Sequence, residues 1–271
     1  MMAVFDDGPE IALPRGDVTE GVVRVGDTVR RPRQATSDGV AEYLRHLEAR
    51  DFDRAPRFLG VDAQGRDVLS FLAGDVAGDD IPTWAAADGV LPSVARLVRL
   101  LHDASAGFAP SSPIHPHVEG RPRPSFPDEP LLISQRDVTP GNTVFRDGEA
   151  WGLIDFDLSD WTTRSVDLAN TAMHWVPLCD PRDRLAAHHN VDVAARLRLM
   201  CDAYGRDALT VPQLLDGADA RFAGSYAAMQ WNAEHLGGGW ARMWNDGAGD
   251  KIRRRAEWFG SVRDELRAAL I

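Results

Sequence analysis

The sequence predicts an α+β protein of two lobes, a small N-terminal antiparallel sheet with one helix and a larger, mostly helical C-terminal lobe. Short segments in which apolar and polar residues alternate fill the chain up to about residue 67, as in half-buried strands. The last third of the chain shows helical periodicity instead. A proline-rich stretch without periodicity, residues 110–130, separates these two patterns.

The N-terminal elements follow from local signals. Residues 22–32 alternate around a Gly-Asp pair, which predicts a hairpin. Capping residues that begin at Thr36 precede apolar residues at helical spacing, so we expect a helix over residues 38–50. Residues 57–61 and 67–71 flank a polar turn and are predicted as strands.

The C-terminal elements are mainly helices. Residues 91–102 place their apolar side chains on one face, which indicates a buried helix. The proline-rich loop then leads into a strand at residues 131–133. Helical periodicity covers residues 184–204, 211–236 and 251–270.

Composition excludes several classes of protein. A chain of 271 residues with 44% hydrophobic and 26% charged residues is typical of a globular enzyme. The net charge of -11 argues against a nucleic-acid partner, since that needs concentrated positive surface. The acidic N-terminus and the lack of a long apolar run predict neither a secretory signal nor membrane association. Cys179 and Cys201 are too few for a disulfide framework, and we expect a cytoplasmic protein.

Three oxygen-bearing side chains make the strongest motif of the chain. Asp137 and Asn142 flank a Pro-Gly turn, and Asp155 follows after one hairpin. An Asp can accept a proton from a hydroxyl, while Asn and Asp oxygens suit a hard cation such as Mg2+. The hairpin formed by residues 142–145 and 150–154 returns Asn142 and Asp155 to one edge. This arrangement predicts phosphoryl transfer.

The segments Gln135 to Asn142, Leu153 to Asp157 and Val166 to Ala169 resemble the aminoglycoside phosphotransferase family, small-molecule kinases related to the protein kinases. The resemblance implies a protein-kinase-like fold with a nucleotide-binding lobe and hinge in residues 1–74. Residues 75–271 would then form the catalytic and acceptor-binding lobe. It further implies that Asp137 is the catalytic base, that Asn142 and Asp155 hold Mg2+, and that Asp167 braces the catalytic loop.

Nucleotide contacts are also implied by the resemblance. The segment Ser70, Phe71 and Leu72 resembles the hinge that binds the base of ATP or GTP. The family's phosphate-binding lysine is missing, because the only lysine is Lys251, so Arg31 is predicted to replace it. Strand alternation puts its neighbour Arg30 on the opposite face. An ordinary core strand at the hinge and a solvated arginine at position 31 remain alternatives.

This chain departs from the family pattern in other ways. Gln135 stands where the family usually has His, and since Gln can also donate a hydrogen bond, we expect it to support the loop in the same way. The family's helix Glu, which pairs with the lysine, would fall near Val40. Glu42 lies on another face of that helix and is expected in solvent.

The resemblance implies that the acceptor is a small hydroxylated molecule or metabolite, and the acidic chain is compatible with a cationic one such as an aminoglycoside or another antibiotic. Asp157, Asp160 and Glu234 are candidates for binding it, although acidic side chains also serve solubility. Two other functions stay open. One is a nucleotide-binding pseudokinase, prompted by the missing lysine. The other is a metal-dependent glycosyltransferase, with Asp155-Phe156-Asp157 as its DxD motif.

Overall fold

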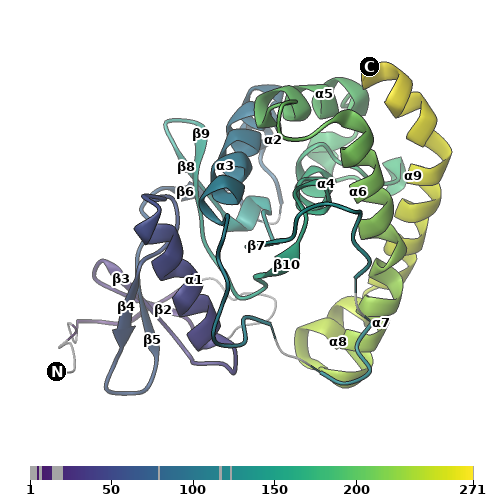
Figure 1. The fold of residues 1–271 in the computed structure, drawn as a ribbon. Coiled ribbons are helices and arrows are strands. Elements are labelled where there is room, and N and C mark those ends of the chain that lie inside the picture. Colours follow the sequence, from purple (N-terminus) through teal and green to yellow (C-terminus); the bar gives the residue numbers. More distant parts are fainter. Residues whose placement is uncertain are drawn as a thin grey trace.

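The computed structural model describes residues 5, 8–13, 21–78, 80–115, 118–122 and 124–270. Its N-terminal part holds an antiparallel sheet in the order β1-β2-β3-β5-β4, with one helix beside it (Figure 1). These elements are β1 (Ile11–Ala12), β2 (Val23–Val25), β3 (Thr28–Arg31), α1 (Ser37–Ala49), β4 (Phe58–Val61) and β5 (Asp67–Ser70). The hairpin, the helix and the two strands expected from the sequence are confirmed.

Strand β3 lies inside this sheet, between β2 and β5. The hairpin from β2 turns at Gly26, whose φ of 57° lies in the left-handed region that favours glycine. Because side chains alternate along a strand, Arg30 and Arg31 point to opposite faces. Arg30 pairs with Asp62 of the loop between β4 and β5, at 3.7 Å from Nε to Oδ2, while Arg31 reaches the C-terminal part.

Helix α1 joins the two parts. Val40, Tyr43, Leu44 and Leu47 form its buried face. The hydroxyl of Tyr43 lies 2.6 Å from the Ser105 hydroxyl and donates to the Ile133 carbonyl at 2.9 Å. Buried hydroxyls need such partners, so this tyrosine ties α1 to β7, the strand that leads into residues 135–142, the predicted catalytic loop.

The C-terminal part is mostly helical, with small sheets where it meets the N-terminal part (Figure 1). One sheet has the order β6-β8-β9 and another pairs β10 with β7. The strands are β6 (Asp75–Val76), β7 (Leu132–Ser134), β8 (Thr143–Arg146), β9 (Glu149–Leu153) and β10 (Asp160–Thr162). The helices are α2 (Thr83–Ala86), α3 (Leu91–Ala104), α4 (Arg164–Trp175), α5 (Val193–Tyr204), α6 (Val211–Ala223), α7 (Ser225–His235), α8 (Gly238–Asn245) and α9 (Ala248–Leu270).

The core of the C-terminal part is formed mainly by helices that pack on one another. Helix α3 packs against α5 and β9, α4 against α6, and α6 against α9. Gly217 of α6 lets that helix approach the backbone of Ser165, where an added Cβ would come within 2.5 Å of a carbonyl carbon. The close contact holds α4, and with it the catalytic loop, against the C-terminal helices.

Two long helices expected from the sequence are shorter in the structure. The helix expected over residues 184–204 is correct only from Val193, because Asp192 caps α5 there and 3-10 turns precede it. The helix expected over residues 211–236 is broken at Gly224 into α6 and α7. Periodicity alone missed both breaks, since it does not register a cap or a glycine. Every helix in the described part of the chain is too short or too polar to cross a bilayer.

Candidate active site

The turn between β7 and β8 carries Asp137 and Asn142, and the fold brings these side chains together. The Asn142 amide donates to Asp137 Oδ2 at 2.7 Å and to the Asp137 carbonyl at 3.1 Å. The amide of Ile154 donates to the Asn142 carbonyl at 3.0 Å, which sets the end of β9 beside the same loop. Asp155 follows directly, so the hairpin places the three residues of the motif around one site, as the spacing predicted.

Gln135 links the catalytic loop to the Asp155 turn. Its buried side chain donates through Nε2 to the carbonyls of Ile154 and Asp155, both at 2.9 Å, and to that of Asp137 at 3.2 Å. Its Oε1 accepts from the Asp137 amide at 2.8 Å. One side chain therefore fixes the backbone at Asp137 and at Asp155, with its donor and its acceptor both in use.

Asp155 has the properties of a metal ligand. Its φ of 55° is unusual for a residue with a side chain, and such angles cluster at functional sites. The carboxylate keeps contact with solvent but is surrounded by protein, and the loss of water raises its pKa while the charge of Arg31 opposes the shift. Within the described residues this carboxylate accepts no hydrogen bond, so its oxygens can take a cation.

Protein ligands alone would not make a complete metal centre here. In the described ranges no group of three or more His, Cys, Asp or Glu residues could hold an ion. Asn142 and Asp155 fit Mg2+, which prefers oxygen donors and usually completes its shell with water and phosphate oxygens. The residues thus fit a metal that arrives with a polyphosphate.

Arg31 pairs with the second acid of the Asp155-Phe156-Asp157 motif. Its guanidinium contacts the Asp157 carboxylate, which also accepts a hydrogen bond from Gln34 at 3.4 Å. Burial lowers the pKa of Arg31, while the negative charges of Asp155 and Asp67 act in the opposite direction. The acidic partner of Arg31 is therefore Asp157, and not a glutamate of helix α1 as the family pattern suggested.

Glu42 has a role that the sequence did not indicate. The expected solvent position is only partly right, because its half-buried carboxylate accepts hydrogen bonds from Ser111 and Ser112. These bonds lower its pKa to about 2. Glu42 fastens α1 to the loop after α3, while Val40 on the neighbouring face is buried in the core.

Two backbone amides of the candidate hinge, residues 70–72, already donate hydrogen bonds within the protein. The amide of Ser70 donates to the Arg57 carbonyl, and that of Phe71 to the Asp27 carbonyl, both at 2.9 Å. Ser70, Phe71 and Leu72 line a surface pocket of about 270 Å³ together with Arg146 and Trp151. The first two amides are therefore used within the fold, and Leu72 follows them in the lining of the pocket.

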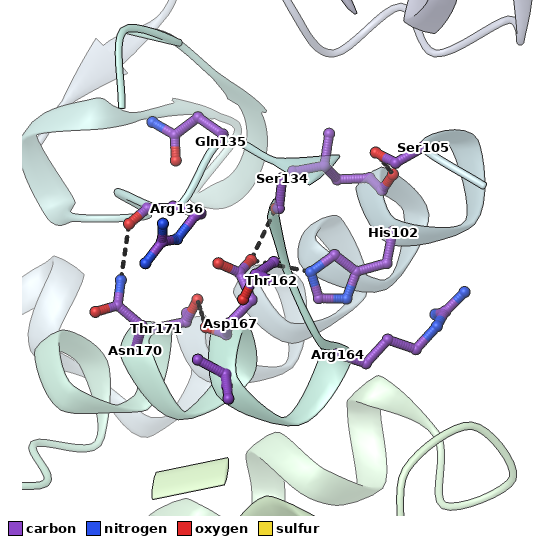
Figure 2. A network of polar contacts seen from close by, with 12 residues as sticks. His102, Ser105, Ser134, Gln135, Arg136, Thr162, Arg164, Asp167, Asn170 and Thr171 are labelled. Carbon is purple, nitrogen blue, oxygen red and sulfur yellow. Dashed lines mark hydrogen bonds and ion pairs between the residues drawn. The ribbon is translucent and has the colours of Figure 1, made fainter. Parts of the chain in front are cut away.

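Asp167 is the centre of a buried network behind the catalytic loop (Figure 2). Its Oδ2 accepts from the Ser134 hydroxyl at 2.8 Å and from His102 Nε2 at 2.9 Å. The other ring nitrogen of His102 lies 2.8 Å from the Tyr204 hydroxyl. Because Ser134 ends the strand that runs into the loop, Asp167 holds the loop at its base. His102 lies in the last turn of α3, a helix that the sequence predicted. Its partners Asp167 and Tyr204 are distant in the chain, so the sequence did not indicate this contact.

Helix α4 braces the loop at two more points. Asn170 donates to the Arg136 carbonyl at 2.9 Å (Figure 2), and its Oδ1 accepts from Arg221 Nε at 2.7 Å. The indole of Trp175 donates to the Val138 carbonyl at 2.7 Å. The carbonyls on both sides of Asp137 are therefore held by α4.

The three acidic candidates for acceptor binding are not joined to one another by any contact in the described part of the chain. Asp157 is paired with Arg31, as above. Asp160 pairs with Arg136 at 3.1 Å, and His115 Nδ1 lies 3.7 Å from its carboxylate. Glu234 accepts a hydrogen bond from Gln230 on the surface of α7. Their assignment to an acceptor stays a prediction.

Comparisons with known proteins agree with this architecture. A family profile described as "Phosphotransferase enzyme family" matches residues 119–200. The chain is 30% identical to the trifolitoxin immunity protein of Rhizobium leguminosarum bv. trifolii, over 96% of this chain and 98% of that protein.

Solved structures show the same fold at lower identity. One is a choline/ethanolamine kinase family protein from Mesorhizobium loti, 17% identical over 97% of this chain and 93% of that one, with a TM-score of 0.61. Another is the GDP complex of aminoglycoside 2'-phosphotransferase-IIIa, 12% identical over 93% of each chain, with a TM-score of 0.59. The two-lobed, protein-kinase-like α+β fold is thereby confirmed.

Proposed function

Since this chain belongs to the phosphotransferase enzyme family, the family of the aminoglycoside phosphotransferases, it is a small-molecule phosphotransferase, and we propose that it moves the γ-phosphoryl group of ATP to an alcohol. The single observation that supports this best is the set of hydrogen bonds made by the Gln135 side chain, which we call the Gln135 clamp. It fixes the backbone at Asp137, the proposed base, and at Asp155, the proposed metal ligand. A chain that had lost catalysis would not need both residues held in one geometry.

Each residue of the motif has one task in this proposal. Asp137, oriented by the Asn142 amide at 2.7 Å, accepts the proton of the acceptor hydroxyl. Asn142 Oδ1 and the Asp155 carboxylate would hold Mg2+, and the bound ion would neutralise part of the phosphate charge. Asp167 and Gln135 are positioning residues, because they act on the loop rather than on the reacting atoms.

The nucleotide would lie between residues 1–74, the proposed nucleotide-binding lobe, and the catalytic residues of 75–271. Arg31 contacts its phosphates and is kept in place by Asp157. The backbone around Leu72 binds the base. The GDP complex of a structural relative supports a purine nucleotide, and ATP and GTP are both donors to be tested.

Two relatives suggest kinds of acceptor. An aminoglycoside, as for the structural relative named after that substrate, is one candidate and would make the enzyme an antibiotic-modifying kinase. A toxin that carries a hydroxyl is the other, since the sequence relative is an immunity protein. The pairing of Asp157 and Asp160 with arginines gives little support to the cationic aminoglycoside.

The proposal is tested by radiolabelled ATP or GTP with Mg2+ and a panel of alcohols, on the native protein and two variants. Asp137→Asn should lower kcat about 10²- to 10⁴-fold with nucleotide affinity nearly unchanged, because only the proton acceptor is lost. Asp155→Asn should instead weaken nucleotide binding in the presence of Mg2+ but not in its absence.

Other outcomes would support other functions. Thermal stabilisation by Mg-ATP that is the same in Asp137→Asn, with no turnover on any alcohol, would indicate a pseudokinase. Stabilisation by a nucleotide sugar in preference to ATP would indicate a glycosyltransferase that uses Asp155 and Asp157. Full turnover in Asp137→Asn would reject the assignment of the base.

A further inference from the structure

Three helices that pack in sequence, α4 on α6 and α6 on α9, each contribute one basic side chain to what we call the acceptor-side cluster: His174 of α4, Arg221 of α6 and Arg255 of α9. The three residues are only partly exposed, with protein around most of each side chain. The chain as a whole carries a net charge of -11, so a group of basic residues next to a proposed catalytic carboxylate is a local exception.

Arg255 is the residue of the cluster without an obvious structural role. In the part of the chain that the structure describes, it makes no hydrogen bond or ion pair, and its Nε is buried without a partner. Its guanidinium lies 5.8 Å from the centre of the Phe222 ring. The nearby carboxylate of Asp183 is already taken by two hydrogen bonds from Arg254, at 2.9 and 2.5 Å. The terminal guanidinium nitrogens of Arg255 are not among the buried unpartnered atoms, so this half-buried cation, which has no partner within the described residues, remains open to a ligand.

Arg221 connects this cation to the site of transfer. It donates to Asn170, which in turn donates to the carbonyl of Arg136, the residue before Asp137. Burial lowers the pKa of Arg221 to about 10, and the positive charges of Arg136 and Arg255 add to the shift, while Asp167 and Asp137 oppose it. Arg221 is therefore within electrostatic range of both Arg255 and the proposed base.

Acids lie near the cluster, but Asp183 and Asp167 have other partners: Asp183 binds Arg254, and Asp167 binds His102 and Ser134. Burial, followed by Arg255 and Arg221, lowers the pKa of His174 to about 3, so this side chain is neutral at pH 7. Arg31 on β3 lies at Asp155 and Asp157, whereas Arg221 lies at Asn170, on the α4 side of the loop. The cluster is thus distinct from the cation that we assign to the nucleotide phosphates.

We propose that Arg255 and Arg221 form an oxyanion subsite, so that the acceptor alcohol carries a carboxylate or a phosphate group. The proposal rests on the phosphotransferase function above and names the class of its substrate. Guanidinium groups bind both oxyanions through paired hydrogen bonds. An anion bound there would pair with the buried charge of Arg255 and hold the rest of the acceptor beside Asp137. A cationic acceptor would meet repulsion at the same place.

Titration calorimetry with small alcohols of similar size tests the subsite without any turnover. The probes are glycerate, glycerol 3-phosphate and ethanolamine, which carry a carboxylate, a phosphate and an ammonium. We expect one or both anionic probes to bind and ethanolamine not to bind. Arg255→Gln should weaken the anionic probe about tenfold, as for the loss of one charge-assisted contact. The tighter of the two anionic probes identifies the oxyanion.

Matched variants show whether Arg255 itself binds the anion. Arg253→Gln removes a cation from the exposed side of the same helix, where it pairs with Asp250, and should leave the affinity unchanged. Arg31→Gln removes the cation on the nucleotide side and should also leave it unchanged. Anion binding that survives Arg255→Gln but is lost in Arg31→Gln would overturn the proposal. So would ethanolamine binding as tightly as glycerate, or neither anion binding the native protein.

Two further readouts keep the test informative. Ligand-free Arg255→Gln should melt no lower than the native protein, because a half-buried charge without a protein partner is removed, whereas a structural arginine would lower the melting temperature. By NMR, the pKa of His174 should rise when the anionic probe binds, and no change there would place the anion elsewhere.

Failure of the subsite and failure of the kinase give different results. Transfer from ATP to ethanolamine that is unaffected by Arg255→Gln would keep the phosphotransferase function and reject the subsite. Anion binding that depends on Arg255, with no transfer to any alcohol, would keep the subsite and reject the proposed function.

Discussion

Two buried polar regions flank the catalytic loop, and they differ in how well their groups are paired. Asp167 accepts hydrogen bonds from Ser134 and His102 at 2.8 and 2.9 Å (Figure 2). The other ring nitrogen of His102 lies 2.8 Å from the Tyr204 hydroxyl. The acceptor-side cluster leaves Arg255 without a hydrogen bond or ion pair in the described part of the chain. A fully paired network positions a loop and stabilises the fold, while an unpaired cation lowers stability unless a ligand completes it. The comparison therefore distinguishes Asp167, which positions the loop, from Arg255, which we propose to bind the acceptor.

The largest effect is expected from breaking the paired network. Asp167→Ala leaves the buried His102 and the Ser134 hydroxyl without their acceptor, which should lower the free energy of unfolding by roughly 3 kcal/mol. Urea unfolding measures the change. As a control, Asp207→Ala removes an exposed carboxylate that pairs with Arg99 and should change the free energy of unfolding far less, because solvent screens the pair. Equal losses in the two variants would contradict the role given to Asp167.

The Gln135 clamp offers a test of positioning with little effect on substrate binding. Gln135→Leu removes the donor to the carbonyls of Ile154 and Asp155, so we expect kcat to fall by about 10²-fold with smaller changes in the Michaelis constants. Gln135→His keeps a donor at this position and should retain most of kcat. Steady-state kinetics on both variants measure kcat and the Michaelis constants. A fully active leucine variant would show that the clamp is dispensable.

The ion pair between Arg31 and Asp157 should matter for the nucleotide. Arg31→Gln removes the proposed phosphate contact and is expected to raise the Michaelis constant for ATP about tenfold. Asp157→Asn leaves the cation in place but loosens it, so its effect should be smaller and in the same direction. If neither substitution changes the Michaelis constant, a different cation binds the phosphates.

The effect of His174 of the acceptor-side cluster is the smallest at neutral pH and appears only in acid. Its pKa in the folded protein, about 3, lies below the ordinary value of 6.5, so the unfolded chain binds more protons between these values. Stability from this residue is therefore present above pH 6.5 and is lost as the pH falls toward 3. Melting temperatures across this window should drop by a few degrees less in His174→Asn than in the native protein.

Arg255→Gln provides a second check on the same histidine. Removing the positive neighbour should move the pKa of His174 upward and narrow the window of acid destabilisation. NMR titration of the ring measures this directly. An unchanged pKa would mean that burial alone sets it, and the acceptor-side cluster would lose its electrostatic coupling.

Much of the fold and of the motif could be predicted from the sequence. The turn at Pro140-Gly141 and the hairpin after Asn142 were both predicted, because turns and short antiparallel pairs depend on neighbouring residues. The helical periodicity of α1 and α3 was also sufficient. The lengths of α5, α6 and α7 were not predicted, because a cap at Asp192 and a break at Gly224 set where these helices begin and end.

Pairings across the chain could not be predicted. Nothing near position 31 in the sequence indicates that Arg31 meets Asp157, 126 residues away. The four contacts of Gln135 likewise depend on where the Asp155 turn is placed by β8 and β9. The acidic candidates for the acceptor were chosen by charge alone, and the arginines of α6 and α9 gave no signal because their sequence surroundings resemble an ordinary helix surface.

The sequence by itself determined the order of the chemical groups, Asp137 before Asn142 before Asp155, and the local turns that bring them to one edge. Only the tertiary structure decided which charges are paired and which are left for a ligand. The physical reason is range: backbone preferences and hydrogen bonds of a turn act over a few residues, whereas the partner of a buried charge is set by the packing of helices that are distant in the chain.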